Sequence, residues 1–335
     1  MRWFFLLFAC AACSSHPLRA ATSEPASASP GRASSASAEA PAARPIFGFH
    51  SGRWTQLHHW LHYAATARRP APKVAPEPPD TPAWDAAVDF YRAEFGPKGG
   101  FGVIFDEGLI DTHRSLSHLA AGERPTDLAP EHAQHLVATA ALVDWAAEDA
   151  RNQSFIASLE PLVAAHGEPF VSTLEDVYAT DWPPRPIRVD VSCFAGPVGA
   201  YTVGDPVHIT ISSCDPDYGR EGALEMIFHE ASHALSDRLE AKISAAARRR
   251  GQEPPRNLWH AVIFYTTGEL ARERLGSHYR PYAERRGLWG GAMGPRKPLA
   301  TEWQPYLDGE RDLDEAVEAL VARALAVDAA QRETD

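Results

Sequence analysis

Residues 207–235 read VHITISSCDPDYGREGALEMIFHEASHAL, and this stretch decides how the chain is expected to fold. The first part, VHITISSC (207–214), alternates apolar and polar residues and is rich in β-branched side chains, which predicts a strand. The second part surrounds His229 and His233 with uncharged residues and belongs to a helix that we expect to end at Gly251. The stretch therefore predicts a strand followed by a largely buried helix.

Within that helix, His229, Glu230 and His233 form the pattern H-E-x-x-H. Two histidines four residues apart lie on one face of a helix, one turn apart, so both rings can reach one metal ion. The side chain of Glu230 points about 100° away from His229, where it can accept a proton from a water molecule that zinc activates. The uncharged neighbours of the motif favour this interpretation over two surface histidines. We predict that His229 and His233 bind zinc and that Glu230 is a general base.

The strand VHITISS followed by EMIFHEASHAL resembles the zincin metallopeptidases, in which an edge strand binds extended substrate and the next helix bears H-E-x-x-H. The longer metzincin motif would need a glycine and a histidine where this chain has Ser236 and Leu239. The resemblance, which covers about thirty residues, therefore implies the gluzincin type, whose third ligand is a glutamate on a later helix. It also implies zinc-dependent hydrolysis of a peptide or protein substrate.

The later helix is expected in NLWHAVIFYTTGELARERL (257–275), which offers Glu269 and His260 as the third ligand. Nine residues at about 100° each put these two side chains half a turn apart, so a straight helix cannot present both to one ion. We favour Glu269, which lies 36 residues after His233, a spacing that the gluzincin resemblance allows, and beside Gly268, which indicates close packing against another helix. His260 is the alternative ligand, and otherwise His260 and Tyr265 are candidates to hydrogen-bond the oxyanion of the transition state.

Other potential ligands fit less well. Weaker candidates for the third position are Glu273 and Asp237. The segment LHHWLH (57–62) has histidines four apart, but no glutamate stands between them and its apolar stripe fits a helix core. His113 and His118 are five apart, which splays them on a helix, so we expect surface or capping roles.

Two cysteines outside the N-terminal segment bear on the arrangement of the strands. A second strand is expected in IRVDVSCF (187–194), and the two strands are joined by a loop rich in Gly and Pro. Cys193 and Cys214 each lie at the C-terminal end of a strand. These ends point in opposite directions in a simple hairpin, so a disulfide would need parallel or offset strands, or a strand end that bends back. The sequence leaves the bond open.

The first residues are typical of a targeting segment. An apolar run of about ten residues follows Arg2 and leads into FACAACSS, which resembles a bacterial lipobox with Cys13, or alternatively Cys10, as the lipidated residue. An ordinary secretory signal is the other interpretation. We divide the chain into a signal peptide with lipobox (1–13), a disordered Ala/Ser/Pro tether (14–45) and one domain (46–335).

Composition limits the function further. The chain has 335 residues, 44% of them hydrophobic and 23% charged, as in a soluble globular protein. A net charge of −12 without a large basic patch argues against nucleic acid as a partner. Helical spacing dominates residues 83–180, so we predict an α+β fold: a mostly helical, zincin-like metallopeptidase domain with a small β-sheet before the H-E-x-x-H helix.

These predictions combine into an exported zinc metallopeptidase of the cell envelope. It would be a lipoprotein held to the membrane only by its N-terminal lipid and would face the periplasm or the outer surface. The alternative is an envelope lipoprotein that binds metal without catalysis. The oligomeric state is left open.

Overall fold

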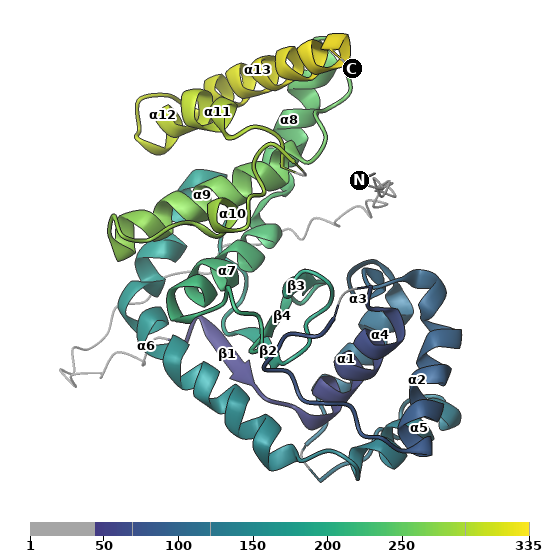
Figure 1. The fold of residues 1–335 in the computed structure, drawn as a ribbon. Coiled ribbons are helices and arrows are strands. Elements are labelled where there is room, and N and C mark those ends of the chain that lie inside the picture. Colours follow the sequence, from purple (N-terminus) through teal and green to yellow (C-terminus); the bar gives the residue numbers. More distant parts are fainter. Residues whose placement is uncertain (1–43, 69, 121, 292, 335) are drawn as a thin grey trace, which may run out of the picture. The chain divides into compact units, whose positions relative to one another are not determined.

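The computed structural model describes residues 44–68, 70–120, 122–291 and 293–334. The signal peptide and nearly all of the tether predicted from the sequence lie outside these residues. The described chain is mostly helical with one small sheet, which confirms the α+β class (Figure 1). Before the second strand it forms a short 3₁₀ turn η1 (Gly96–Lys98) and six helices, which are α1 (Arg53–Thr66), α2 (Pro82–Glu94), α3 (Gly102–Phe105), α4 (Glu107–Ser117), α5 (Pro130–Ala140) and α6 (Trp145–Tyr178).

The sheet has four strands in the order β1-β2-β4-β3. They are β1 (Phe47–His50), β2 (Ile187–Ser192), β3 (Ala200–Val203) and β4 (His208–Ser212). Strands β1, β2 and β4 are parallel, and β3 pairs antiparallel with β4. The loop expected between two strands therefore contains a third strand, and the strand predicted at 207–214 lies inside the sheet, whereas β3 lies at its edge.

The parallel pairing of β2 with β4 also decides the cysteine question. It puts the C-terminal ends of both strands side by side, with the Cα atoms of Cys193 and Cys214 4.7 Å apart. The two sulfur atoms form a disulfide of 2.05 Å. Of the arrangements that would allow the bond, the structure has the parallel one.

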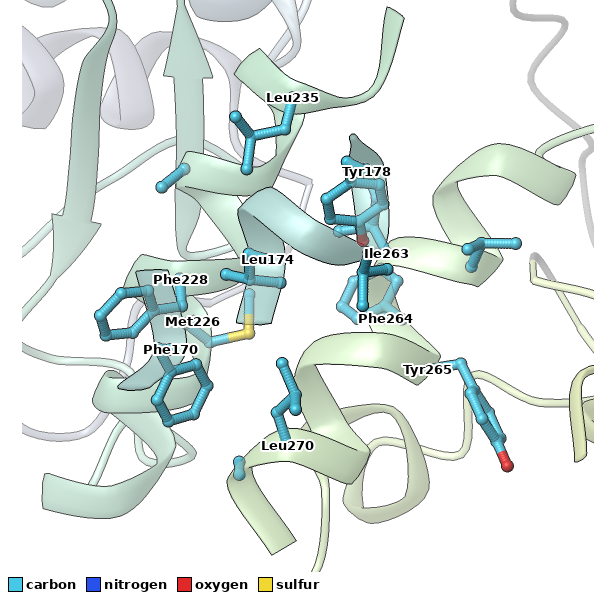
Figure 2. Close-up of a cluster of buried hydrophobic side chains, with 14 of the residues drawn as sticks. Phe170, Leu174, Tyr178, Met226, Phe228, Leu235, Ile263, Phe264, Tyr265 and Leu270 are labelled. Carbon is cyan, nitrogen blue, oxygen red and sulfur yellow. The ribbon is translucent and has the colours of Figure 1, made fainter. Parts of the chain in front are cut away.

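Alternation along the strands gives the sheet two different faces. Apolar side chains such as Val189 and Ile209 lie on one face, in the main core. Helix α6 adds Phe170 to this core, and α7 (Arg220–Ser232) adds Phe228 (Figure 2). Side chains of Asp190, His208 and Tyr201 lie on the other face, because Asp190 pairs with Thr210, which also pairs with Tyr201, and His208 is two residues from Thr210. The polar face is covered rather than solvated, since helices α1 and α3 contact β2 and β3, respectively.

The H-E-x-x-H segment is not one long helix. The helix expected up to Gly251 is divided into α7 (Arg220–Ser232), a 3₁₀ turn η2 (His233–Leu235) and α8 (Asp237–Arg249). The hydroxyls of Ser232 and Ser236 donate to the backbone oxygens of Phe228 and His233, which are 2.7 and 3.1 Å away. Such bonds from serine to the preceding turn bend helices, which accounts for the break.

The remaining chain is helical. Its elements are α9 (Leu258–Leu275), α10 (Tyr282–Arg285), α11 (Arg296–Pro298), the π-helical turn η3 (Leu299–Trp303), α12 (Gln304–Leu307) and α13 (Leu313–Thr334). Helix α9 contacts α7, and α13 contacts α8. In the part of the chain that the structure describes, every helix is too short or too polar to cross a membrane.

Candidate metal centre

Three histidines converge where α7, η2 and α9 meet. His229 is in the last turn of α7, His233 is the first residue of η2, and His260 is in the first turn of α9. The Nε2 atoms of His229 and His260 are 3.2 Å apart, and the possible ligand nitrogens of all three lie within 4.8 Å of one another. Tetrahedral zinc with Zn–N bonds of about 2.0–2.1 Å needs nitrogen pairs roughly 3.3 Å apart. The pair formed by His229 and His260 has this spacing, and the three side chains together could hold one metal ion.

Aromatic side chains pack against the imidazole rings of this cluster, and burial lowers their pKa values. Phe264 stacks on His229 with ring centroids 3.9 Å apart, and Trp259 stacks on His260 at 5.0 Å. Burial lowers the pKa of His233 to about 4 and that of His260 to about 3, and it lowers the pKa of His229 well below its usual value. All three imidazoles are thus neutral near pH 7, the form that binds metal.

His229 is oriented by packing rather than by a second hydrogen bond. Its Nδ1 atom is buried, with no hydrogen-bond partner among the described residues. Histidine ligands usually donate this second N–H to an oxygen atom. The stacked ring of Phe264 therefore has to hold the imidazole of His229 in place.

The Glu230 carboxylate lies beside this cluster. Its Oε2 is 3.9 Å from Nε2 of His233, and the Thr202 hydroxyl lies 2.8 Å from both Oε2 and the backbone oxygen of Glu230. Burial raises the pKa of Glu230 to about 8, against the opposing effect of the Thr202 hydrogen bond. A carboxyl group with such a pKa can both take up and release a proton near neutral pH.

Glu269, the favoured third ligand from the sequence, is not part of the cluster. It forms ion pairs with Arg296 at 2.5 Å and Arg272 at 3.2 Å. The side chains of Glu269 and His260 point to opposite sides of α9, and His260 is the one that faces α7. The structure therefore does not bring Glu269 to His229 and His233, and it brings His260, the alternative, to them instead.

Tyr265 also points elsewhere. Its hydroxyl donates to Oε1 of Gln304 at 2.8 Å, and Figure 2 shows its ring directed away from the apolar cluster around Leu174 and Met226. The structure thus does not bring Tyr265 to the metal candidates. Of the two predicted oxyanion donors, only His260 lies beside His229 and His233.

Close packing on α7 and on the segment after α9 determines how α9 is rotated about its own axis. A Cβ atom added to Gly268 would lie 2.8 Å from Cβ of Pro281 and 3.4 Å from Oε1 of Glu225. Glu225, one turn before His229 on α7, accepts hydrogen bonds from the Tyr279 hydroxyl at 2.5 Å and from the backbone N–H of Tyr282 at 2.8 Å. Gly268 thus packs closely, as expected, but its nearest neighbour is Pro281 in the segment after α9, and its contact with another helix is to Glu225 of α7.

A second group of possible ligands lies on the polar face of the sheet. His113, Asp190 and His208 are at most 7% exposed, and their ligand atoms also lie within 4.8 Å of one another. His113 was expected at the surface or at a cap, and this expectation is wrong, whereas His118 does cap the C-terminus of α4. Asp190 and His208 were not singled out, although alternation in both strands placed them on a single face.

Of the histidines in LHHWLH, His58 links two helices. His58 is buried on α1, and its Nδ1 lies 2.9 Å from the Tyr91 hydroxyl of α2. It belongs to neither group of three possible ligands found among the described residues.

Comparison of the chain with protein-family models, with curated proteins and with solved structures found no match. A functional assignment therefore depends on the H-E-x-x-H motif and on the geometry around it.

Proposed function

We propose that this domain is a zinc-dependent hydrolase, in which His229, His233 and His260 hold the metal and Glu230 is the general base. One observation carries the proposal: three neutral imidazoles from α7, η2 and α9 converge beside a buried carboxylate of raised pKa. Buried groups with shifted pKa values gather at functional sites, and a purely structural histidine cluster does not need such a carboxylate.

The proposed division of labour follows from the side chains. Zinc, when bound, would supply a Lewis acid that polarises a carbonyl group and lowers the pKa of water to about 7. Glu230 would accept the proton of the attacking water and later hand it to the leaving amine. Thr202 would orient the carboxylate, because its single hydroxyl proton can be donated to Oε2.

The edge of the sheet suggests how an extended peptide would bind. Strand β3 is at the edge of the sheet, contacts α7 and carries Thr202, the hydrogen-bond partner of Glu230. An extended chain can add to such an edge through backbone hydrogen bonds. We therefore propose that β3, rather than β4 (the strand predicted at 207–214), binds the substrate. Peptide hydrolysis remains the proposed reaction.

The proposed ligand set differs from that of the implied gluzincin type. A histidine, His260, takes the place of the glutamate. The proposal is therefore a zincin-like hydrolase in the broad sense.

Export of the domain is part of the proposal. The disulfide between Cys193 and Cys214 is typical of proteins that fold in an oxidising compartment. This agrees with the N-terminal signal and with lipid attachment at Cys13 or Cys10, which lie outside the described residues. We propose a lipid-anchored envelope protein whose partner is a peptide or protein substrate.

The test compares the wild-type protein with Glu230→Gln and with Glu221→Gln as a matched control. Glu221 is on the same helix, but its side chain is 43% exposed and pairs with His278. All three proteins should hold about one zinc per catalytic site. Glu230→Gln should reduce hydrolysis of a peptide library about 10²- to 10⁴-fold, while Glu221→Gln should not change it.

Two outcomes would overturn the proposal in different ways. A Glu230→Gln protein as active as the wild type would exclude the general-base role. A zinc-loaded wild-type protein that hydrolyses no member of the library would favour the alternative, a metal-binding envelope protein without catalysis.

A further inference from the structure

A buried cluster on the opposite face of the sheet has the composition of a second metal site. His113 comes from α4, Asp190 from β2 and His208 from β4. The Nε2 atoms of His113 and His208 lie 3.1 and 2.8 Å from the same oxygen, Oδ2 of Asp190. Two imidazoles and one carboxylate are a common ligand set for first-row transition metals.

The protons around this cluster can be placed from a chain of hydrogen bonds that starts in α1. Nδ1 of His59 is 2.6 Å from the backbone oxygen of Thr55, which can only accept, so Nδ1 carries the proton. His59 is buried, and burial favours the neutral ring, so its Nε2 is bare. The Tyr201 hydroxyl, 2.6 Å from that nitrogen, must then donate to it.

The same logic continues from Tyr201 to His113. The single hydroxyl proton of Tyr201 is used on His59, so the Tyr201 oxygen can only accept from Nδ1 of His113, 3.4 Å away. A neutral His113 with its proton on Nδ1 turns a bare Nε2 toward Oδ2 of Asp190. This is the tautomer that would bind a cation between Nε2 and Oδ2, whereas the other tautomer donates Nε2–H to the carboxylate across the same 3.1 Å.

The surroundings fix the carboxylate in the orientation that a metal needs. Arg188 donates to the other oxygen of Asp190, Oδ1, at 2.8 Å and to the backbone oxygen of Ser117 at 2.7 Å. It therefore leaves Oδ2 to the two histidines. Outer groups of this kind, here Arg188 on the carboxylate and Tyr201 on the imidazole, orient ligands in known metal sites.

We propose that His113, Asp190 and His208 bind a second divalent transition-metal ion, with zinc as the first candidate. The ion would join α4 to β2 and β4, and so attach the N-terminal helices to the sheet, on the side opposite α7 (Figure 1). All three ligands are buried, so the role is structural and separate from the proposed hydrolytic centre. The inference does not depend on that centre.

Zinc titration of the metal-stripped full-length protein tests the proposal. The His229→Ala/His233→Ala variant lacks the first centre and should still bind about one zinc per chain. Adding Asp190→Asn, which keeps the shape of the side chain, should abolish this binding. Adding His118→Gln instead should leave it unchanged, because His118 is exposed at the end of the same helix as His113.

Two results would overturn the second site. One is a His229→Ala/His233→Ala protein that binds no more zinc than the same protein with Asp190→Asn. The other uses the wild-type protein, so it does not depend on the folding of a variant. Crystals grown with zinc should give an anomalous peak among His113, Asp190 and His208, and ordered side chains without a peak would exclude the site.

Discussion

Substitution of His260 and Glu269 by alanine separates the two candidates for the third ligand. The structure assigns His260 to the proposed zinc site and Glu269 to ion pairs with Arg296 and Arg272. His260→Ala should therefore lower zinc affinity, whereas Glu269→Ala should lower the free energy of unfolding without a change in affinity.

The expected magnitudes differ enough to be distinguished. Four-ligand zinc sites bind with about 10–16 kcal/mol, so an even share is about 2.5–4 kcal/mol per ligand, or about 10²- to 10³-fold in affinity. The side chain of Glu269 is 19% exposed, and those of Arg296 and Arg272 are 33% and 32% exposed. Solvent screens such pairs, so removal of the carboxylate should cost about 1 kcal/mol of unfolding free energy.

The assay is competition for zinc with a chromophoric chelator, together with urea denaturation of the metal-free proteins. Both measurements use the full-length chain. His233→Ala is the positive control, since it removes a ligand of the H-E-x-x-H motif. If Glu269→Ala loses zinc while His260→Ala keeps it, the assignment from the structure is wrong. If both keep it, the third ligand lies elsewhere.

Three further substitutions probe the contacts around the centre. Thr202→Val should shift the acidic limb of the pH profile of kcat/KM upward and Thr202→Ser should not, because loss of a hydrogen bond to the ionised form raises the pKa of Glu230 further. Burial raises the pKa of Glu225 from 4.5 to about 7, so its ionisation costs about 3 kcal/mol, and its contribution to the unfolding free energy should fall as pH rises through this window. Glu225→Gln should therefore make the unfolding free energy rise relative to that of the wild type over this window in urea denaturation, while the contribution of Glu230 remains. Gly268→Ala should cost about 1–3 kcal/mol in the same assay, because the new Cβ atom meets Pro281 at 2.8 Å.

Each of these expectations has a clear contrary result. Equal pH profiles for the valine and serine variants would remove Thr202 as the residue that orients Glu230. An unchanged pH slope in Glu225→Gln would assign that slope to other groups. Wild-type stability in Gly268→Ala would mean that α9 is not held by the contact with Pro281.

Local features of the chain were predictable because they depend on neighbouring residues. The spacing of His229 and His233 and the alternation in both strands depend on residues two to four positions apart, and the structure has a helix and strands there. The break of the H-E-x-x-H helix after Ser232 was missed, although serines that can bond to the preceding turn were visible in the sequence.

Other features depend on parts of the chain that meet only after folding. Helical periodicity showed that Glu269 and His260 face opposite ways, but the packing of α9 on α7 decided which of them meets His229. Strand β3 lies between β2 and β4 in the sequence but at the edge of the sheet, and β2 and β4 are parallel neighbours. This pairing brings Cys193 to Cys214.

The second cluster shows the same limit most clearly. Alternation in the strands placed Asp190 and His208 on one face, but no local pattern indicates whether that face meets water or other residues. Helices α1, α3 and α4, from a distant part of the chain, cover it and bring His113 to it. The sequence by itself determined the H-E-x-x-H pair and the elements that carry it. The tertiary structure alone decided the third histidine and the buried His-Asp-His group, because these contacts join residues 18 to 95 positions apart.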